Sequence, residues 1–304
     1  MLLLRNFVIY LSYRFYRDVE KKMQEFRNGK YEGERALFMT EDAAVYDSVF
    51  SNGESPLKES KNLNIYNCSF GWKYPLWYCN NVRVYDGVLN ETARAGIWYT
   101  NDLFMKGSKI DAPKTFRRCH NINLENISMS KADETLWHCD KVIGKNLTAK
   151  GDYFGMNSKN VEIEGLNLDG NYPFDGGENI VIRNSKLMSK DAFWNCRDVS
   201  IYDSYISGEY LGWNSENLTF VNCRIESLQG LCYIKNLKMV NCVLENTTLC
   251  FEYSSVDAEI NSNIESVKNP YSGKIKAKSI SRLIMEPDRI DPLKTIIEVE
   301  DSEI

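Results

Sequence analysis

The chain has 304 residues, a net charge of −5 and 43% apolar residues. It can therefore bury a large core. It lacks the clustered basic face that phosphate binding requires, so we do not expect nucleic acid as a partner. The nine cysteines are odd in number and include no CxxC pair, which indicates reduced thiols and a cytoplasmic protein rather than a disulfide framework.

The chain begins with an apolar segment, residues 1–16, that is interrupted by Arg5 and Arg14. The segment is too short to span a bilayer and no secretory cleavage site follows it, so we expect no membrane span. Three interpretations stay open: a helix that caps the following domain, a helix on a membrane surface, or an upstream start codon with Met23 as the natural first residue. We treat residues 1–29 as an N-terminal extension or cap, of which 1–22 lie outside the natural protein under the last interpretation.

A repeat of 19 to 20 residues occupies most of the remaining chain. Each copy opens with a short segment that begins with Asn or Asp, as in NLNIYNC from Asn62, NVEIEGL from Asn160 and NLTFVNC from Asn217. A fixed period of this length is typical of solenoid proteins, in which each repeat forms one coil.

Apolar and polar residues alternate at the start of each copy. The second and fourth positions are apolar, such as Val161 and Ile163, whereas their neighbours are polar, which predicts a strand with one buried face. The sixth position is mostly Asn, Asp or Gly, residues that tolerate positive φ and turn the chain at a corner. A further apolar column, which includes Leu168, predicts a second short strand after that corner.

These patterns predict an all-β fold, namely a single-stranded right-handed parallel β-helix of about twelve coils with a short N-terminal helix or cap. We expect one continuous β-helix over residues 30–285, because no coil can bury its apolar face alone. Residues 286–304 are expected to cap the last open edge. The right hand is favoured because parallel crossovers are almost always right-handed.

The segment KYEGERALF (residues 30–38), the degenerate coils and the segments with Cys two residues after Trp resemble one known family. It is a bacterial family catalogued only as a domain of unknown function, number 3737. The resemblance extends from about Met23 to the C-terminus. It implies a pectin-lyase-like right-handed β-helix, and it implies no catalytic residue because that family has no established activity.

The second half of each coil contains an apolar column followed by a row of large residues. The apolar column, which includes Ile97 and Phe116, never carries a charge, so we expect it to face inward and the next residue to face outward. Exposed tryptophans there would offer platforms to the flat apolar faces of sugars, with free N–H groups. In the alternative, the parity slips by one residue and the tryptophans pack inside. The predicted ligand-binding residues are Trp98, Arg117, Trp137, Asp175 and Trp194.

A more acidic row lies two residues before the apolar column. Its members Glu134 and Asp152 fall one coil apart, at ~5 Å, which is close to the carboxyl separation of retaining glycosidases. These two residues are therefore candidate catalytic groups. The alternatives are a Ca²⁺ site and a solvated corner at which acidic residues are merely tolerated.

Stacking of adjacent coils is also expected to place Arg118 beside His138, on the flank of Glu134. Arginine, histidine and a carboxylate together can bind and protonate an acidic sugar, so Arg118 and His138 complete the candidate catalytic set. In the alternative, Cys119 and Cys139 belong to an interior ladder of small residues and the histidines are ordinary flank residues. Their spacing matches no zinc motif, so we expect neither a metal nor a cofactor.

Two functions are consistent with these patterns. The first is binding or processing of carbohydrate, in particular an acidic oligosaccharide, with a glycoside hydrolase or lyase-like activity if the protein is an enzyme. The second is a non-catalytic scaffold that binds a protein partner or a second copy of itself. The side-chain direction of Trp98, Trp137 and Trp194 distinguishes them, because buried tryptophans would remove the main support for the first.

Overall fold

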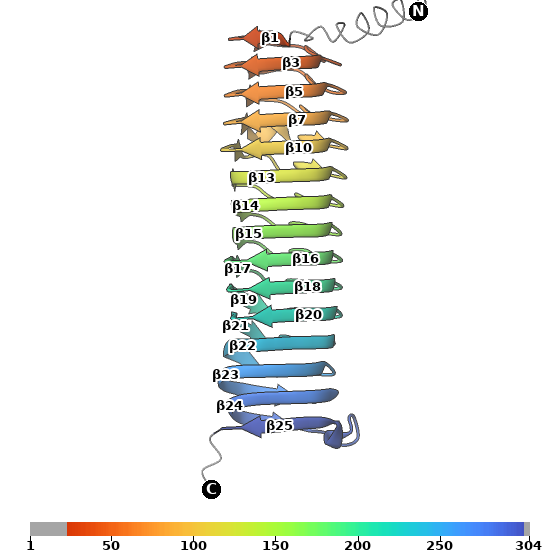
Figure 1. The fold of residues 1–304 in the computed structure, drawn as a ribbon, viewed down its shortest axis with the longest axis vertical. Helices are drawn as coiled ribbons and strands as arrows, with labels where there is room; N and C mark the ends of the chain where they lie inside the picture. Colours follow the sequence, from red (N-terminus) through yellow and green to blue (C-terminus); the bar gives the residue numbers. More distant parts are fainter. Residues whose placement is uncertain (1–22, 301–304) are drawn as a thin grey trace, which may run out of the picture.

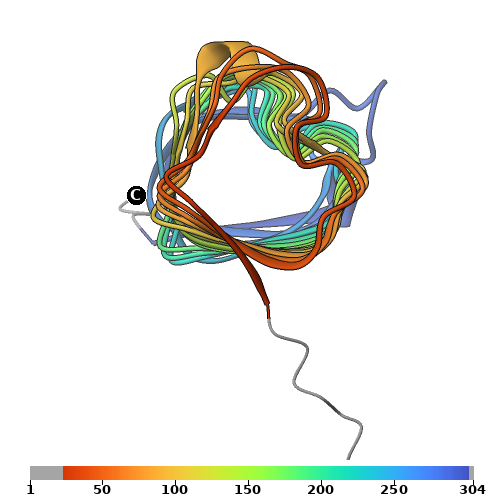
Figure 2. The same cartoon turned by 90° about the horizontal axis from the view of Figure 1, so that it is seen from above.

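Short parallel strands stack coil upon coil into a straight column (Figure 1). The chain descends from the N-terminal end while the strands at the front all run from right to left, which makes the coil right-handed (Figure 1). Seen along its axis, the coils superimpose on one closed outline (Figure 2). The computed structural model describes residues 23–300, so the interpretations of residues 1–22 lie outside the described part.

Fifteen strands form the main ladder, in which each strand pairs in parallel with its counterpart one coil away. They are β1 (Gln24–Arg27), β3 (Glu41–Tyr46), β5 (Lys61–Tyr66), β7 (Asn80–Tyr85), β10 (Asn101–Lys106), β13 (His120–Met129), β14 (Asp140–Lys150), β15 (Lys159–Asp169), β16 (Glu178–Arg183), β18 (Arg197–Tyr202), β20 (Glu216–Val221), β22 (Lys235–Thr248), β23 (Ser255–Lys268), β24 (Ser272–Ile284) and β25 (Thr295–Val299).

A second ladder follows the first corner of each coil, and it is continuous with the main strand in the coils that contain the longest strands. Its separate strands are β2 (Lys30–Tyr31), β4 (Val49–Phe50), β6 (Ser69–Phe70), β8 (Val88–Leu89), β11 (Lys109–Ile110), β17 (Lys186–Met188), β19 (Tyr205–Glu209) and β21 (Arg224–Leu228). The third wall contains only β9 (Ile97–Trp98) and β12 (Phe116–Arg117), and the 3-10 turns are η1 (Glu91–Ala93) and η2 (Pro292–Lys294).

The predicted all-β, right-handed parallel β-helix is confirmed, and it contains fifteen coils rather than about twelve. The additional coils lie at the two ends of the ladder. There, β1 pairs with β3, and β25 pairs with β24, although these segments lack the Asn-initiated pattern of the central repeats. Strand pairing in a solenoid is made by the backbone, so a coil can form without the side-chain signature of its neighbours.

The interior is filled by the alternating apolar columns that the sequence predicts. In β15, for example, Val161, Ile163, Leu166 and Leu168 are buried, whereas Glu162 and Asn167 are exposed. Behind the third wall lies a column of buried aromatic rings, in which Phe174 and Phe193 stack at 5.5 Å between ring centroids. Burial of this kind is the main favourable term in folding.

The corner predicted at the sixth position of the repeat is formed by residues in the left-handed region, such as Asn184 and Asn222 with φ of 49° and 54°. The first position is left-handed as well, since Asn160 and Asn179 have φ of 53° and 55°. Their side chains also bond along the axis: Asn179 Nδ2 donates to Asn160 Oδ1 at 2.7 Å, and Asn160 Nδ2 donates to the carboxylate of Asp140 at 2.6 Å. Asparagine tolerates this conformation better than most residues, and the amide ladder holds successive corners in register.

All nine cysteines are buried and free of disulfides. Cys79, Cys119, Cys139 and Cys196 belong to an interior ladder with Thr100, Ser158 and Ser215, which was the alternative interpretation of the Cys-His segments. Burial raises the pKa of the Cys79 and Cys196 thiols to about 12, so these thiols are protonated at neutral pH.

No helix within residues 23–300 is long and apolar enough to cross a lipid bilayer.

Candidate functional site

A continuous line of aromatic rings follows the outer side of the third wall, and we call it the aromatic stripe. Each ring contacts the next within 6.5 Å between centroids, except where Arg117 takes the place of a ring. The stripe comprises Tyr74, Trp77, Tyr78, Trp98, Tyr99, Trp137, Tyr153, Tyr172, Trp194, Tyr210, Trp213, Tyr233 and Tyr253.

The tryptophans of the stripe are half-buried and lie outside the core, since the adjacent anchors Ile97 and Phe116 are fully buried. Trp77 and Trp98 stack on each other at 5.0 Å with an interplanar angle of 8°. This distance is close to the coil spacing of ~4.8 Å, so the rings cover each other's faces and turn their edges outward. The expected platform of exposed ring faces is therefore replaced by a ladder of ring edges.

The indole N–H groups are also largely used inside the protein. Trp98 Nε1 donates to the carbonyl oxygen of Lys114 at 2.7 Å, and Trp194 Nε1 donates to that of Tyr210 at 2.6 Å. The expectation that the indole N–H groups are free for a ligand is wrong for Trp98 and Trp194, because these indoles reach the next coil and satisfy a backbone carbonyl there.

Arg117 interrupts the aromatic stripe as a cation between two indoles. Its Cζ lies 4.9 Å from the ring centroid of Trp98 and 4.6 Å from that of Trp137. The guanidinium forms an ion pair with Glu134, and its Nε is buried without a hydrogen-bond partner. Planar stacking on both sides fixes the position of this charge more firmly than an exposed lysine could be fixed.

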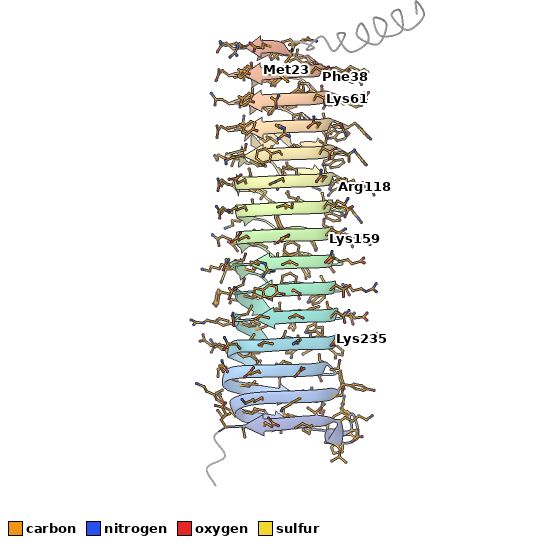
Figure 3. The ribbon with its side chains drawn as sticks, in the orientation of Figure 1. Met23, Phe38, Lys61, Arg118, Lys159 and Lys235 are labelled. Atoms are coloured by element: carbon orange, nitrogen blue, oxygen red, sulfur yellow. The ribbon has the colours of Figure 1, made fainter. Side chains whose placement is uncertain are left out.

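Charges of both signs surround Arg117. Glu134 is shared by Arg117 and by Lys114, whose Nζ lies 3.0 Å from its Oε1. The next corner carries the exposed Arg118 (Figure 3), which lies beside His138 as the sequence predicted. Partial burial, and then the charges of Arg118 and Arg117, lower the pKa of His138, so this imidazole is neutral at pH 7.

Asp152 does not lie directly below Glu134, contrary to the expected alignment of the two coils. The amide of Glu134 donates to the carbonyl of Asp152, which in a parallel pair places Tyr153 opposite Glu134. Asp152 instead follows Asp133, and its carboxylate accepts a hydrogen bond of 2.7 Å from the amide of Asn171. The alignment failed because it assumed an offset of 18 residues, whereas Glu134 and its partner Tyr153 lie 19 residues apart, as in most coils. The catalytic assignment of the two residues stays a prediction.

The lower part of the stripe is acidic. Asp175 occupies the same row as Arg117 and neighbours Trp194, and it accepts a hydrogen bond from Asn195 at 2.8 Å. Asp191, in the row of Glu134, is the one charged side chain in the buried class among residues 23–300. Burial, followed by the neighbouring charges of Glu209 and Asp175, raises its pKa, whereas a hydrogen bond from Tyr172 opposes that rise.

The sequence repeat places Asp191 in the acidic row but does not predict that it is more buried than the other acids of that row. Its lateral neighbours in the adjacent coils are Tyr172 and Tyr210. Nor does the pattern indicate that the Arg117 side chain stacks between Trp98 and Trp137. Both features require the lateral register of three coils. That register follows from the common 19-residue spacing only after the longer coils are aligned.

Within residues 23–300, no three His, Cys, Asp or Glu side chains gather in an arrangement that could hold a metal ion.

A family model described as "Protein of unknown function (DUF3737)" matches residues 24–298, which confirms the resemblance found in the sequence. No curated protein matches the chain.

Several solved structures are similar to the chain at low identity. The A-module of an Azotobacter vinelandii mannuronan C-5 epimerase has 10% identity and a TM-score of 0.34, with 90% of this chain and 88% of that chain covered. The Streptococcus pneumoniae surface protein and adhesin PfbA has 9% identity and a TM-score of 0.35, with coverages of 90% and 89%. The catalytic domain of a GH87 alpha-1,3-glucanase has 9% identity and a TM-score of 0.34, with coverages of 95% and 66%. Likeness at these TM-scores carries no argument about function.

Proposed function

Because the chain belongs to the DUF3737 family of proteins of unknown function, its role must be inferred from its own side chains, and we propose that it binds acidic oligosaccharides. The binding surface in this proposal is the section of the aromatic stripe from Trp98 to Trp137. The observation that supports it most strongly is the guanidinium of Arg117, held between two indoles and accompanied by the side chains of Lys114 and Arg118.

Electrostatics favour an anionic ligand over a neutral one at this section. Lys114, Arg117 and Arg118 supply three positive charges, and two of them share the carboxylate of Glu134. The carboxylates of Asp133 and Asp152 accept hydrogen bonds from backbone amides instead. Besides partial burial, the two arginine charges lower the pKa of His138, which is consistent with a positive local potential. A carboxylate on a ligand would therefore gain charge-assisted hydrogen bonds, which are stronger than those between neutral groups.

The geometry of the rings favours the same ligand class. Aromatic rings carry a positive edge and a negative face, and the stacked rings of Trp77 and Trp98 turn their edges outward. Oxygen atoms of a sugar acid can approach such edges, and the adjacent tyrosines add hydroxyl groups, as in Tyr78, which is 48% exposed. The row extends along the axis, so an extended chain of sugar rings fits it better than a compact molecule does.

The candidate catalytic residues take positioning or binding roles in this proposal. Glu134 orients Arg117 and Lys114, Arg118 contacts the anionic group, and His138 lies beside it as a neutral donor. Asp175 and Trp194 belong to the acidic part of the stripe and would contact uncharged portions of a long ligand. Turnover by Glu134 and Asp152 stays a separate prediction, which E134Q and D152N test in an assay of sugar release.

Isothermal titration calorimetry with tetragalacturonate tests the proposal, with its fully methyl-esterified form as the neutral counterpart. The charged tetrasaccharide should bind and the ester should not. R117A should lower the affinity about tenfold or more, because a hydrogen bond to a charged group contributes about 1.5–3 kcal/mol. R118A should lower it less, because Arg118 is not held in a stack.

Arg83 provides the matched control, because it is an exposed arginine on β7, on the main sheet rather than on the stripe. R83A should bind tetragalacturonate as the unmodified protein does. Thermal melting of each variant checks that the fold is intact. Equal affinity for the charged and esterified ligands, or an unchanged affinity of folded R117A, would overturn the proposal and favour a scaffold that binds another protein through its aromatic edges.

A further inference from the structure

A groove lies on another side of the solenoid, at the corner between the main ladder and the second ladder. It has a volume of about 730 Å³ and spans the coils of β16, β18 and β20. One side is the corner ladder of Gly165, Asn184, Asp203 and Asn222, all with positive φ. The other side consists of long side chains on β17, β19 and β21. The groove is shallow and open to solvent, so a ligand would be held by the groups on its two sides rather than enclosed.

The long side chains are a local feature of one outward column. Lys186, Tyr205 and Arg224 occupy it in successive coils. In the other coils the column carries two lysines, Lys30 and Lys109, and otherwise small or uncharged residues, namely Val49, Ser69, Val88, Ser128, Thr148, Asn167 and Val243. Lys109 has small neighbours, Val88 and Ser128, and it pairs with Asp111 at 2.9 Å. The groove is therefore deepened where three large side chains follow one another.

Tyr205 holds a cation on each side. Lys186 Nζ lies 6.0 Å from its ring centroid, and Arg224 Cζ lies 5.8 Å from it. Arg224 is further held by Glu245, which accepts from its Nε at 2.8 Å. The two cations lie two coils apart, or about 10 Å along the axis. Both are thus partly ordered before any ligand arrives, which lowers the entropic cost of binding.

The corner side supplies amide groups and one carboxylate. Asp203 accepts a hydrogen bond from Asn222 Nδ2 at 2.9 Å, so this acid is partly satisfied within the ladder. The amide of Asn184 belongs to the same ladder, and Asn167 lines the groove near Lys186. Cations on one wall, and amides on either side of Asp203 on the other, match a ligand that directs an anionic group toward the cations and hydroxyl groups toward the corner.

We propose that this groove binds a hydroxylated anion of about the size of one sugar, in which a phosphate or a carboxylate contacts Lys186 and the hydroxyl groups contact the Asn184 and Asn222 amides. The site is separate from the aromatic stripe and does not depend on the function proposed there. Its anionic group is expected nearer to Lys186 than to Arg224, because Arg224 already has a carboxylate partner.

Calorimetric titration with glucose 6-phosphate, glucuronate and glucose tests this site. We expect millimolar or tighter binding of at least one of the two anions, and none of glucose. Binding of glucose 6-phosphate alone would identify a phosphate site, and binding of glucuronate alone would identify a carboxylate site. K186A should weaken the binding at least fivefold, and R224A should weaken it less.

K109A is the matched control, because Lys109 occupies the same column where the groove is absent. It should not change the affinity. R117A, on the aromatic stripe, should also leave this binding intact, and K186A should leave the binding of tetragalacturonate intact, so the two proposals fail independently. Absence of binding by both anions at 20 mM, or binding that folded K186A and R224A retain in full, would overturn the assignment.

Discussion

The upper and lower parts of the aromatic stripe share one backbone and one core but differ in charge. In the upper part, the outward row places Arg117 between two tryptophans. In the lower part, the same row places Asp175 beside Trp194, and the buried Asp191 lies in the adjacent row. The parallel pairing of coils is the same in both. A solenoid can therefore change its surface chemistry one coil at a time, because each outward residue is independent of the strand that carries it.

The shared core can be tested by truncating one buried ring behind each part. F116A and F193A remove fully buried side chains behind the basic and the acidic part. Each should lower the free energy of unfolding by about 3–5 kcal/mol. Urea unfolding monitored by circular dichroism measures the effect. If the free energy of unfolding fell much less in one variant than in the other, the two parts would not share an equivalent core.

The role of the Arg117 sandwich can be tested by rebuilding it in the acidic part. Met156 and Asp175 precede Trp194 in the outward row, so M156W together with D175R reproduces the order Trp–Arg–Trp. Introduced into R117A, this pair should restore a measurable part of the lost affinity for tetragalacturonate, in the range of a few-fold to tenfold. M156W alone is the control, and recovery by M156W alone would show that the guanidinium is not the decisive group.

The acidic part should show its own pH dependence of stability through Asp191. Its pKa is raised in the folded protein, chiefly by burial, so the folded state binds this proton more tightly than the unfolded state. The contribution of the carboxyl group to stability is therefore present below its ordinary pKa of about 3.9 and is lost as the pH rises through its raised value.

Thermal melting between pH 3.5 and pH 6.5 measures this effect. The melting temperature of D191N, relative to that of the unmodified protein, should increase as the pH rises. Y172F removes the hydrogen bond that opposes the shift, so it should make the pH-dependent loss larger. A difference between D191N and the unmodified protein that stays constant over this range would contradict the raised pKa.

The repeat predicted the architecture because each coil repeats the same burial pattern, and the Asn184 and Asn222 corners are visible as residues that tolerate positive φ. The outward direction of the tryptophans could be inferred from the charges of Arg117 and Asp175 in the same row. What could not be inferred was ring orientation. Trp77 stacks on Trp98, so the two ring faces point toward each other along the axis of the solenoid. The indole N–H of Trp98 donates to the carbonyl oxygen of a residue sixteen positions later in the chain.

The pairing of Glu134 with Asp152 failed for a related reason. One residue more or less before a corner shifts every later residue of the coil relative to its neighbour, and in this coil it exchanged Asp152 for Tyr153. Short-range patterns determine the faces of each strand, whereas the lateral register is determined by backbone hydrogen bonds between coils. Charged clusters that span several coils are therefore the features that a sequence pattern locates least accurately.

The central claim, that an acidic oligosaccharide binds beside Arg117 and Arg118, is tested most directly by the titration of His138. The chain has two histidines, so proton NMR should show two imidazole signals, and His120, which pairs with Asp140 at 3.0 Å, provides the internal reference. Nearby arginine charges help to lower the pKa of His138. Saturating tetragalacturonate should raise that pKa by neutralising them and leave the His120 signal unaffected, whereas the methyl ester should change neither. An unchanged His138 titration at saturating tetragalacturonate would contradict binding at this section of the stripe.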